Sequence, residues 1–467
     1  MELTKNTPFS WKFTLPLYLG STLNPINSSL IATALVPISL SLRVPVGQVA
    51  ALVAAVYLTS SVAQPAAGKL SEVLGPRLVF LVGTLCVFIA GLVGGFGQNL
   101  AQLIVARVLV GLGSSTAYPS AMILVRRRAA EAGLKEIPGG ILGGLAVAGM
   151  AIAALGLPLG GFLVGTAGWR MTFFANIPIA LLTFLFGFWG LPNDKGTRRF
   201  KGASKIFTQL DLGGMVLFAG SITSLLSFLL SLPRTNWILL SLVVVTGMAF
   251  IFWELKVQTP FIDLRLLFRN GALSRTYARV ALTGLIMYGV MYGVSQWLEP
   301  ARGFSPEQAG FLLLPMTLVA PFVSFPVSKR NLVRGPLLVT SVALVVGSIS
   351  LLTFNSQTPV FTIVIVMLAF GIVMGLFSVA NQTALYSQAP AHDMGTAAGL
   401  FRTFAYLGSI GSSALTGIIF SKSVNNHGLS LLAWTFLGAS VLVFILTIFD
   451  KALHNHKRGS YGKQTDQ

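Results

Sequence analysis

Long apolar runs recur from one end of this 467-residue chain to the other, and most are about 18 residues or longer. A run of that length is enough to cross the roughly 30 Å hydrocarbon core of a bilayer as a helix. Only 10% of the residues are charged, far below the roughly 25% of a soluble domain. The sequence therefore predicts an all-α integral membrane protein with fourteen transmembrane helices, at 14–41, 49–67, 78–97, 101–123, 138–164, 172–191, 212–232, 237–253, 278–298, 308–327, 336–354, 359–380, 396–420 and 429–449.

The basic residues are distributed unevenly between the connections of these spans. With the N-terminus inside, 25 of the 32 Lys and Arg residues fall in cytoplasmic segments and 5 in outer segments, and Arg107 and Arg402 complete the set. This asymmetry is typical of the positive-inside rule and predicts that both termini are cytoplasmic, in a plasma or inner membrane. The net charge of +19 lies mainly in these basic loops. The loops are expected to contact anionic lipids, and binding to nucleic acid is not expected. The first run is too long for the core of a signal peptide and is expected to stay as a span.

Arg107 and Arg402 stand inside apolar stretches, and all 13 acidic residues fall in predicted loops, span ends or tails. Ionisable groups at membrane depth are costly, so they are functional candidates by default. The buried ionisable set is expected to be basic only, which favours neutral or anionic solutes over dications. The other candidates for a substrate or coupling cavity are uncharged residues expected at depth, namely Asn24, Asn27, Ser28, Gln64, Tyr288, Tyr292 and Gln296.

An alternative interpretation of these polar residues is structural. Each of the uncharged ones could hydrogen-bond between neighbouring helices, and Arg107 could bind backbone carbonyls to pin the first span. Cys86, the single cysteine, is interpreted as a small packing residue.

A weak internal repeat suggests two halves. The loop after the second span and the loop after the tenth both contain a Gly-Pro pair, at Gly75-Pro76 and Gly335-Pro336. Duplicated halves are the usual plan of a rocking transporter. The expected organisation is a six-helix half at 1–191, an inserted helix pair at 192–256, a second six-helix half at 257–450 and a cytoplasmic tail at 451–467.

Two segments are candidates for conformational gating. Residues 68–77 contain Gly68, Glu72, Gly75 and Arg77, in which the glycines permit a tight turn. Glu72 can accept hydrogen bonds from a helix N-terminus or pair with Arg77 or another basic residue, and so act as a latch. In the fifth span, small residues and a proline would allow close helix packing and a kink, at Gly156, Pro158, Gly160 and Gly161.

These segments resemble motifs of the major facilitator superfamily. Residues 68–77 are similar to its loop motif, with Glu72 in place of the usual Asp, and residues 107–113 to its Arg-x-x-x-Gly-x-Gly motif. Residues 156–161 resemble its antiporter motif with the proline displaced by one position. Residues 168–178, 260–269 and 302–315 resemble the fourteen-span drug:proton antiporter branch. The resemblance implies two six-helix halves plus two inserted helices, multidrug efflux, a proton-transfer role for Arg107, and protons as the coupling ion.

The sequence also departs from that branch. Relatives usually carry an Asp in the first span, whereas Asn27 or Ser28 occupies the position here. Residues 405–408 replace a common Arg-Gln-Leu-Gly, with Arg402 one turn earlier, and Glu299 replaces a common Gln. Proton coupling through an acid in the first span is therefore not expected.

The leading functional hypothesis is a secondary exporter of amphiphilic drugs or toxic compounds that works by alternating access, as a monomer, and could confer antibiotic resistance. Alternatives are a transporter of an anionic metabolite or lipid, or a membrane receptor or regulator with a transporter fold. The four histidines stand in loops or the tail, and there is neither a paired-carboxylate site nor a P-loop, so we expect neither an enzyme nor a primary pump. No cofactor or metal is expected.

Overall fold

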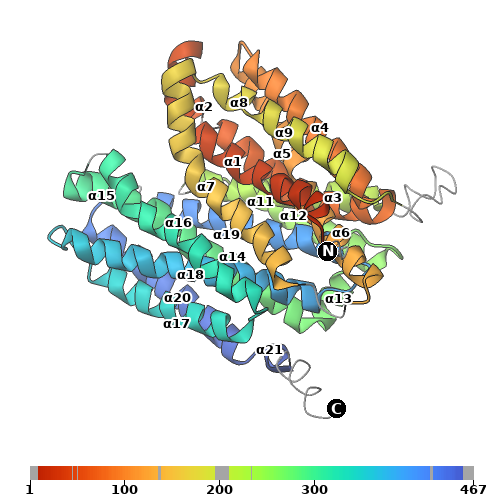
Figure 1. The fold of residues 1–467 in the computed structure, drawn as a ribbon. Coiled ribbons are helices and arrows are strands. Elements are labelled where there is room, and N and C mark those ends of the chain that lie inside the picture. Colours follow the sequence, from red (N-terminus) through yellow and green to blue (C-terminus); the bar gives the residue numbers. More distant parts are fainter. Residues whose placement is uncertain are drawn as a thin grey trace, which may run out of the picture. The chain divides into compact units, whose positions relative to one another are not determined.

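The computed structural model describes residues 9–44, 46–49, 51–134, 138–194, 210–232, 234–304, 306–420 and 424–455, and the regular elements within them are helices (Figure 1). Within these described ranges, eleven helices are long and apolar enough to cross a membrane, or twelve if the bent pair Trp11–Ile31 and Thr33–Leu42 is one span. Each of the fourteen predicted segments lies on one helix or on consecutive helical elements, but 138–164 and 396–420 are not among these candidates. The all-helical fold is confirmed, whereas the number fourteen stays a prediction.

The chain divides into two compact units. The first comprises residues 1–223, 246–263 and 390–403, and the second comprises 224–245, 264–389 and 404–467. The first unit holds α1 (Trp11–Leu42), α2 (Val46–Val49), α3 (Ala51–Leu74), α4 (Pro76–Gly95), α5 (Leu100–Ser114), α6 (Ala117–Glu131), α7 (Gly139–Ala167), α8 (Met171–Phe174) and α9 (Asn176–Gly190).

The second unit holds α13 (Leu264–Arg269), α14 (Gly271–Gly289), the π-helical turn η1 (Val290–Val294), α15 (Ser295–Arg302), α16 (Pro306–Lys329), α17 (Arg334–Leu352), α18 (Val360–Gln388), α20 (Asn426–Ile448) and α21 (Ala452–Asn455). Residues of α11 (Leu212–Ser231), α12 (Trp237–Lys256) and α19 (Met394–Ile419) are shared between the two units. The predicted division at residues 191, 256 and 450 is not tested by this grouping.

Within the first unit, small residues set the closest helix contacts. Helix α1 packs along α7, and α4 packs against α5 and α9 (Figure 1). A Cβ on Gly83 of α4 would stand 1.9 Å from Thr116 Oγ1 and 2.7 Å from Gly113 O. Helices in lipid associate through such close contacts because there is no hydrophobic driving force between them.

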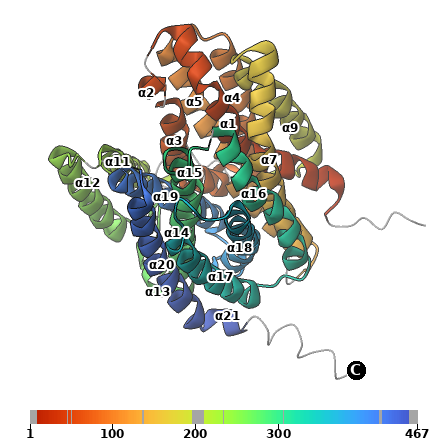
Figure 2. The same ribbon diagram turned by 90° about the vertical axis from the view of Figure 1, so that its left-hand side faces the viewer.

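The second unit has its own apolar core. Helix α16 packs along α18, and α17 packs against α18 and α20 (Figure 2). A Cβ on Gly375 of α18 would stand 2.4 Å from Ala320 O of α16, so the two backbones approach closely. Trp297, Phe370 and Phe436 are buried in this core.

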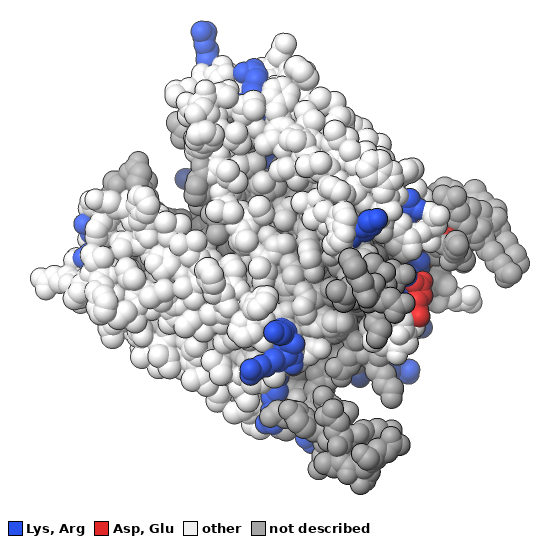
Figure 3. All heavy atoms as spheres, viewed as in Figure 1, with Lys and Arg blue, Asp and Glu red and all other residues white. Residues whose placement is uncertain are grey.

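The outer surface is mostly apolar. Large hydrophobic side chains are exposed along many helices, including Trp237, Val245, Phe322 and Phe361. Figure 3 shows one face on which Lys and Arg are few and Asp and Glu fewer. An exposed apolar surface of this extent is expected of a multi-pass membrane protein whose helices face lipid.

Candidate functional site

Arg107 of α5 is buried in the first unit, where it holds two other helices through their backbones. Its Nε donates to Leu52 O of α3 at 3.0 Å, and its Nη1 donates to Asn27 O of α1 at 3.2 Å. Its Nη2 has no hydrogen-bond partner within the described residues. This geometry is the one expected of an arginine that pins the first span, and a role of Arg107 in binding a substrate stays a prediction.

The polar residues predicted on α1 take part in hydrogen bonds between helices. Asn24 Nδ2 donates to Ser60 Oγ of α3 and Ser114 Oγ of α5, each at 3.1 Å. Asn27 Nδ2 donates to Asn176 Oδ1 of α9 at 2.5 Å. The structure thus brings Asn24, Asn27 and Arg107 into one polar layer that joins α1, α3, α5 and α9.

Two further residues predicted for the cavity lie on α1 and α3, which are helices of this layer. Ser28 Oγ donates to Asn24 O at 3.2 Å, which is a contact inside α1. Gln64 is buried in α3. Both residues therefore take part in the packing of the first unit. Their role in substrate binding stays a prediction.

Arg402 lies in the part of α19 that belongs to the first unit. Its guanidinium stands 4.3 Å from the ring centroid of Tyr118, a distance typical of a cation–π contact. The next residue, Thr403, donates from Oγ1 to Ser61 O of α3 at 2.7 Å. The half-buried guanidinium is therefore held against an aromatic ring rather than against a carboxylate.

The remaining cavity candidates lie in the second unit. The rings of Tyr288 and Tyr292 stack with centroids 6.0 Å apart at the π-helical turn that joins α14 to α15. Turns of this kind are frequent at functional sites. Gln296 is exposed, and its role in a substrate cavity stays a prediction. The side chain of Glu299 lies outside the described residues.

Glu72 is bound to the beginning of α19. Its Oε1 accepts a hydrogen bond from Thr396 N at 2.9 Å, and its Oε2 accepts one from Thr396 Oγ1 at 3.2 Å. A Cβ on Gly68 would stand 2.2 Å from Gly395 O, so α3 and α19 touch backbone to backbone at this point. The partner of Glu72 in the structure is thus a helix N-terminus, which is one of the partners predicted from the sequence.

Gly75 and Arg77 shape the turn between α3 and α4. Gly75 has a φ angle of +106°, a backbone conformation that residues with a side chain rarely adopt. Arg77 Nη2 donates to Phe188 O, and its guanidinium lies 5.4 Å from the Phe188 ring centroid. The backbone amides of Arg77 and Leu78 donate to Asp194 at 3.3 and 3.0 Å. Asp194, which the sequence did not single out, thus satisfies the first turn of α4.

Two of the glycines predicted in the fifth span lie against α1. A Cβ on Gly156 would stand 2.3 Å from Ser29 Cβ, and a Cβ on Gly160 would stand 2.5 Å from Thr33 Oγ1. Gly161 has nothing within 4 Å of such an atom. The side chain of Pro158 lies outside the described residues. The close packing of α7 on α1 therefore depends on Gly156 and Gly160.

The expectation that the buried ionisable groups are basic only is wrong. In the second unit Arg279 and Asp450 are both fully buried, and Arg279 Nη1 donates to Asp450 Oδ2 at 2.8 Å. Arg275 Nη2 donates to Asp450 Oδ1 at 2.7 Å. In the first unit Asp211 and Glu254 are buried as well. Burial of these acids is a tertiary effect, because each stands at the end of a predicted span.

Asp450 follows α20 and is held ionised by its two arginines. Burial acts to raise the pKa of this carboxyl, but hydrogen bonds and charge from Arg275 and Arg279 outweigh it and hold the pKa below its ordinary value. Arg279 Nη2 also donates to Thr276 Oγ1 at 2.7 Å. The group is a buried, hydrogen-bonded ion network that ties α14 to the end of α20.

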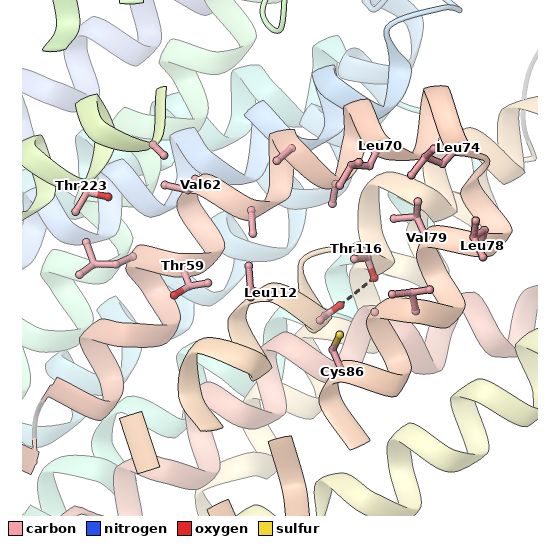
Figure 4. A pocket seen from close by; sticks show the side chains of 18 residues that line it. Thr59, Val62, Leu70, Leu74, Leu78, Val79, Cys86, Leu112, Thr116 and Thr223 are labelled. Atoms are coloured by element: carbon pink, nitrogen blue, oxygen red, sulfur yellow. Dashed lines mark hydrogen bonds between the residues drawn. The ribbon is translucent and has the colours of Figure 1, made fainter. Parts of the chain in front are cut away.

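The first unit contains an apolar cavity of about 640 Å³ lined by α3, α4, α5 and α11 (Figure 4). Leu70, Leu74 and Leu78 stand toward one end of it and Thr59, Val62 and Thr223 toward the other (Figure 4). None of the residues predicted for a substrate cavity lines it. Its apolar walls suit hydrocarbon rather than a charged solute.

Comparison with known proteins agrees with this architecture. The sequence profile of the Major Facilitator Superfamily matches residues 17–413. The chain is 34% identical over 412 residues to the uncharacterized MFS-type transporter YwoD of Bacillus subtilis (strain 168), covering 87% of this chain and 89% of the relative. It is 27% identical over 430 residues to the tetracenomycin C resistance and export protein of Streptomyces glaucescens, covering 89% and 77%.

Among solved structures, the human organic anion transporter MFSD10 (TETRAN) is similar with a TM-score of 0.67 at 17% identity, over 93% of this chain and 99% of that one. At that identity the likeness shows the fold alone. The profile match and the 34% identical relative confirm the resemblance at the level of the superfamily. The chain belongs to the major facilitator superfamily, and it is a multi-pass membrane transporter of small molecules rather than an enzyme.

Proposed function

We propose that this transporter exports amphiphilic small molecules by alternating access, with protons as the coupling ion. The observation that carries the proposal is the contact of Glu72 with Thr396, at a place where Gly68 and Gly395 let α3 and α19 touch. The direction of transport is supported by the relative that exports tetracenomycin C.

The Glu72 contact has the properties of a reversible latch. A carboxylate at a helix N-terminus interacts with the unpaired amides and the helix dipole there. The contact is polar and small, so water can replace it when the helices separate. It can thus stabilise one arrangement of α3 and α19 without making it permanent.

The polar groups of the first unit suit a neutral or anionic substrate. Arg107 keeps one buried donor without a partner within the described residues, and the guanidinium of Arg402 lies over the ring of Tyr118. Asn27, which with Ser28 is a candidate for the position where relatives carry an acid, is bound to Asn176 and offers no negative charge. Desolvating a dication would require a carboxylate that this layer does not contain among its described residues.

The substrate class is tested by transport into energised inverted vesicles, with tetracenomycin C as a large aromatic probe, an organic anion and a dicationic antiseptic. We expect the first two to accumulate and the dication not to. Arg402→Ala should lower uptake of the anion by about tenfold, since a charge-assisted hydrogen bond contributes about 1.5–3 kcal/mol. Arg402→Lys, which keeps the charge, is the control. Strong transport of the dication, or an Arg402→Ala variant that behaves as wild type with every probe, would contradict this assignment.

The same assay separates the alternatives. Uptake restricted to the anion would favour a metabolite or lipid transporter. Binding of a probe without uptake against a gradient would favour a receptor or regulator with a transporter fold. Dissipating the proton gradient should abolish uptake if protons are the coupling ion.

We further propose that the chain has fourteen spans with both termini in the cytoplasm, from the asymmetry of 25 inner against 5 outer basic residues. Reporter fusions at Gln467 and near Lys201 are expected to report a cytoplasmic position. A fusion near Arg234, which is predicted to be outside, is the matched control. An outside signal at Gln467 or near Lys201 would be incompatible with fourteen spans in this orientation.

A further inference from the structure

Two buried carboxyl groups meet where α11 begins and α12 ends, within the first unit. Asp211 Oδ1 accepts hydrogen bonds from Gly214 N at 3.0 Å and Trp253 Nε1 at 2.8 Å. Asp211 Oδ2 accepts one from Phe261 N at 3.0 Å. Glu254 Oε2 accepts one from Ile262 N at 3.2 Å. The two side chains thus fasten residues 261–262 to the helix pair.

Of the four oxygens of these two carboxyl groups, Glu254 Oε1 takes no part in the hydrogen bonds above. Glu254 is 1% exposed, and its Oε1 has no hydrogen-bond partner within the part of the chain that the structure describes. A Cβ on Gly214 would stand 2.3 Å from Asp211 Oδ2 and 2.5 Å from Glu254 Oε1, so the two oxygens are close neighbours. Gly214 leaves room for both oxygens, because a side chain at this position would collide with each of them.

Among the described residues, Lys69 is the basic side chain recorded as acting on Glu254. Its Nζ donates to Pro260 O at 3.2 Å, and its single charge also acts on Glu72 and Asp393. Two adjacent buried carboxylates repel one another, and burial disfavours the ionised form further. If Glu254 Oε1 carries a proton, its O–H can donate a hydrogen bond to Asp211 Oδ2. This arrangement would remove the repulsion between the two carboxylates and give Oε1 a hydrogen-bond partner.

We propose that Asp211 and Glu254 form a proton-binding site in which a proton on the Glu254 carboxyl group is held against Asp211. The site does not depend on the transport proposal, because it holds its proton in the resting protein without a substrate. Its loss of the proton would set two like charges against each other and weaken the attachment of residues 261–262 to α11 and α12.

Infrared spectroscopy of the purified full-length protein during a pH titration tests the site. The wild type should show a protonated carboxylic acid band at neutral pH that disappears at higher pH. Both Glu254→Gln and Asp211→Asn should lack that contribution, because the remaining carboxylate then accepts a hydrogen bond from the new amide. Glu131→Gln, which changes an exposed carboxyl at the end of α6, should leave the band unchanged.

Stability gives a second measurement. The folded chain holds a proton that the unfolded chain releases at neutral pH, so the free energy of unfolding of the wild type should fall as the pH rises. Glu254→Gln keeps the shape of the side chain and should flatten this dependence. Should that variant fail to fold, Asp211→Asn offers the reverse arrangement of donor and acceptor. A wild-type spectrum identical to those of both variants, or an equal pH dependence of stability in all three proteins, would overturn the proposal.

Discussion

Replacing Glu72 with alanine is expected to slow transport by about tenfold to a hundredfold, because an ordinary hydrogen bond contributes about 0.5–1.5 kcal/mol and two are lost. The substitution removes both bonds from Thr396 and so destabilises the arrangement in which α3 meets the beginning of α19. Glu72 is not part of the polar layer around Arg107, so binding of a substrate at equilibrium should change little. Initial rates of uptake and equilibrium binding, measured on the same vesicles, separate the two effects.

Thr396→Val is the matched control for the latch. It removes the hydroxyl donor but keeps the backbone amide, so one of the two bonds to Glu72 persists. Its transport rate should fall between those of the wild type and Glu72→Ala. If Glu72→Ala abolished binding at a normal protein level, Glu72 would be a substrate ligand and the latch role would be refuted.

Arg279→Ala is expected to destabilise the protein by about 3–5 kcal/mol, the usual cost of removing one partner of a buried ion pair. Asp450 would lose the arginine that is buried with it, and Arg275, the other arginine bound to it, has a side chain that is 35% exposed. Thermal unfolding of the purified variant should show the loss, as should a lower yield of folded protein in the membrane. Arg275→Ala is the control and should cost less, because the buried pair survives.

The same pair sets a dependence of stability on pH. The pKa of Asp450 is lower in the folded chain than the value of about 3.9 expected when it is unfolded. Stabilisation by this group is therefore fully present above that value and is lost as the pH falls through the lower, folded value. The Asp450→Asn variant should show a weaker loss of stability in acid. An Arg279→Ala variant as stable as Arg275→Ala would show that the buried pair is not the stabilising feature.

The positions of the helices can be predicted from hydropathy, because about twenty consecutive apolar residues leave a chain in lipid little alternative to satisfying its backbone within each helix. The sequence also indicated local features whose partners lie nearby or are backbone atoms. The positive φ of Gly75, the packing of Gly156 and Gly160 on α1, and the carbonyl contacts of Arg107 all follow from residue types that permit few other arrangements.

The polar groups that are buried together could not be predicted from hydropathy, because the fold brings them together from distant parts of the chain. Glu72 and Thr396 are 324 positions apart, Arg279 and Asp450 171, and Asp211 and Phe261 50. Asp450 and Glu254 stand at span ends, where hydropathy alone predicts exposure. Their burial depends on which helix or returning segment covers that end. Hydropathy measures the cost of placing one residue in lipid, whereas the charge a buried carboxyl keeps depends on the partner that folding brings to it.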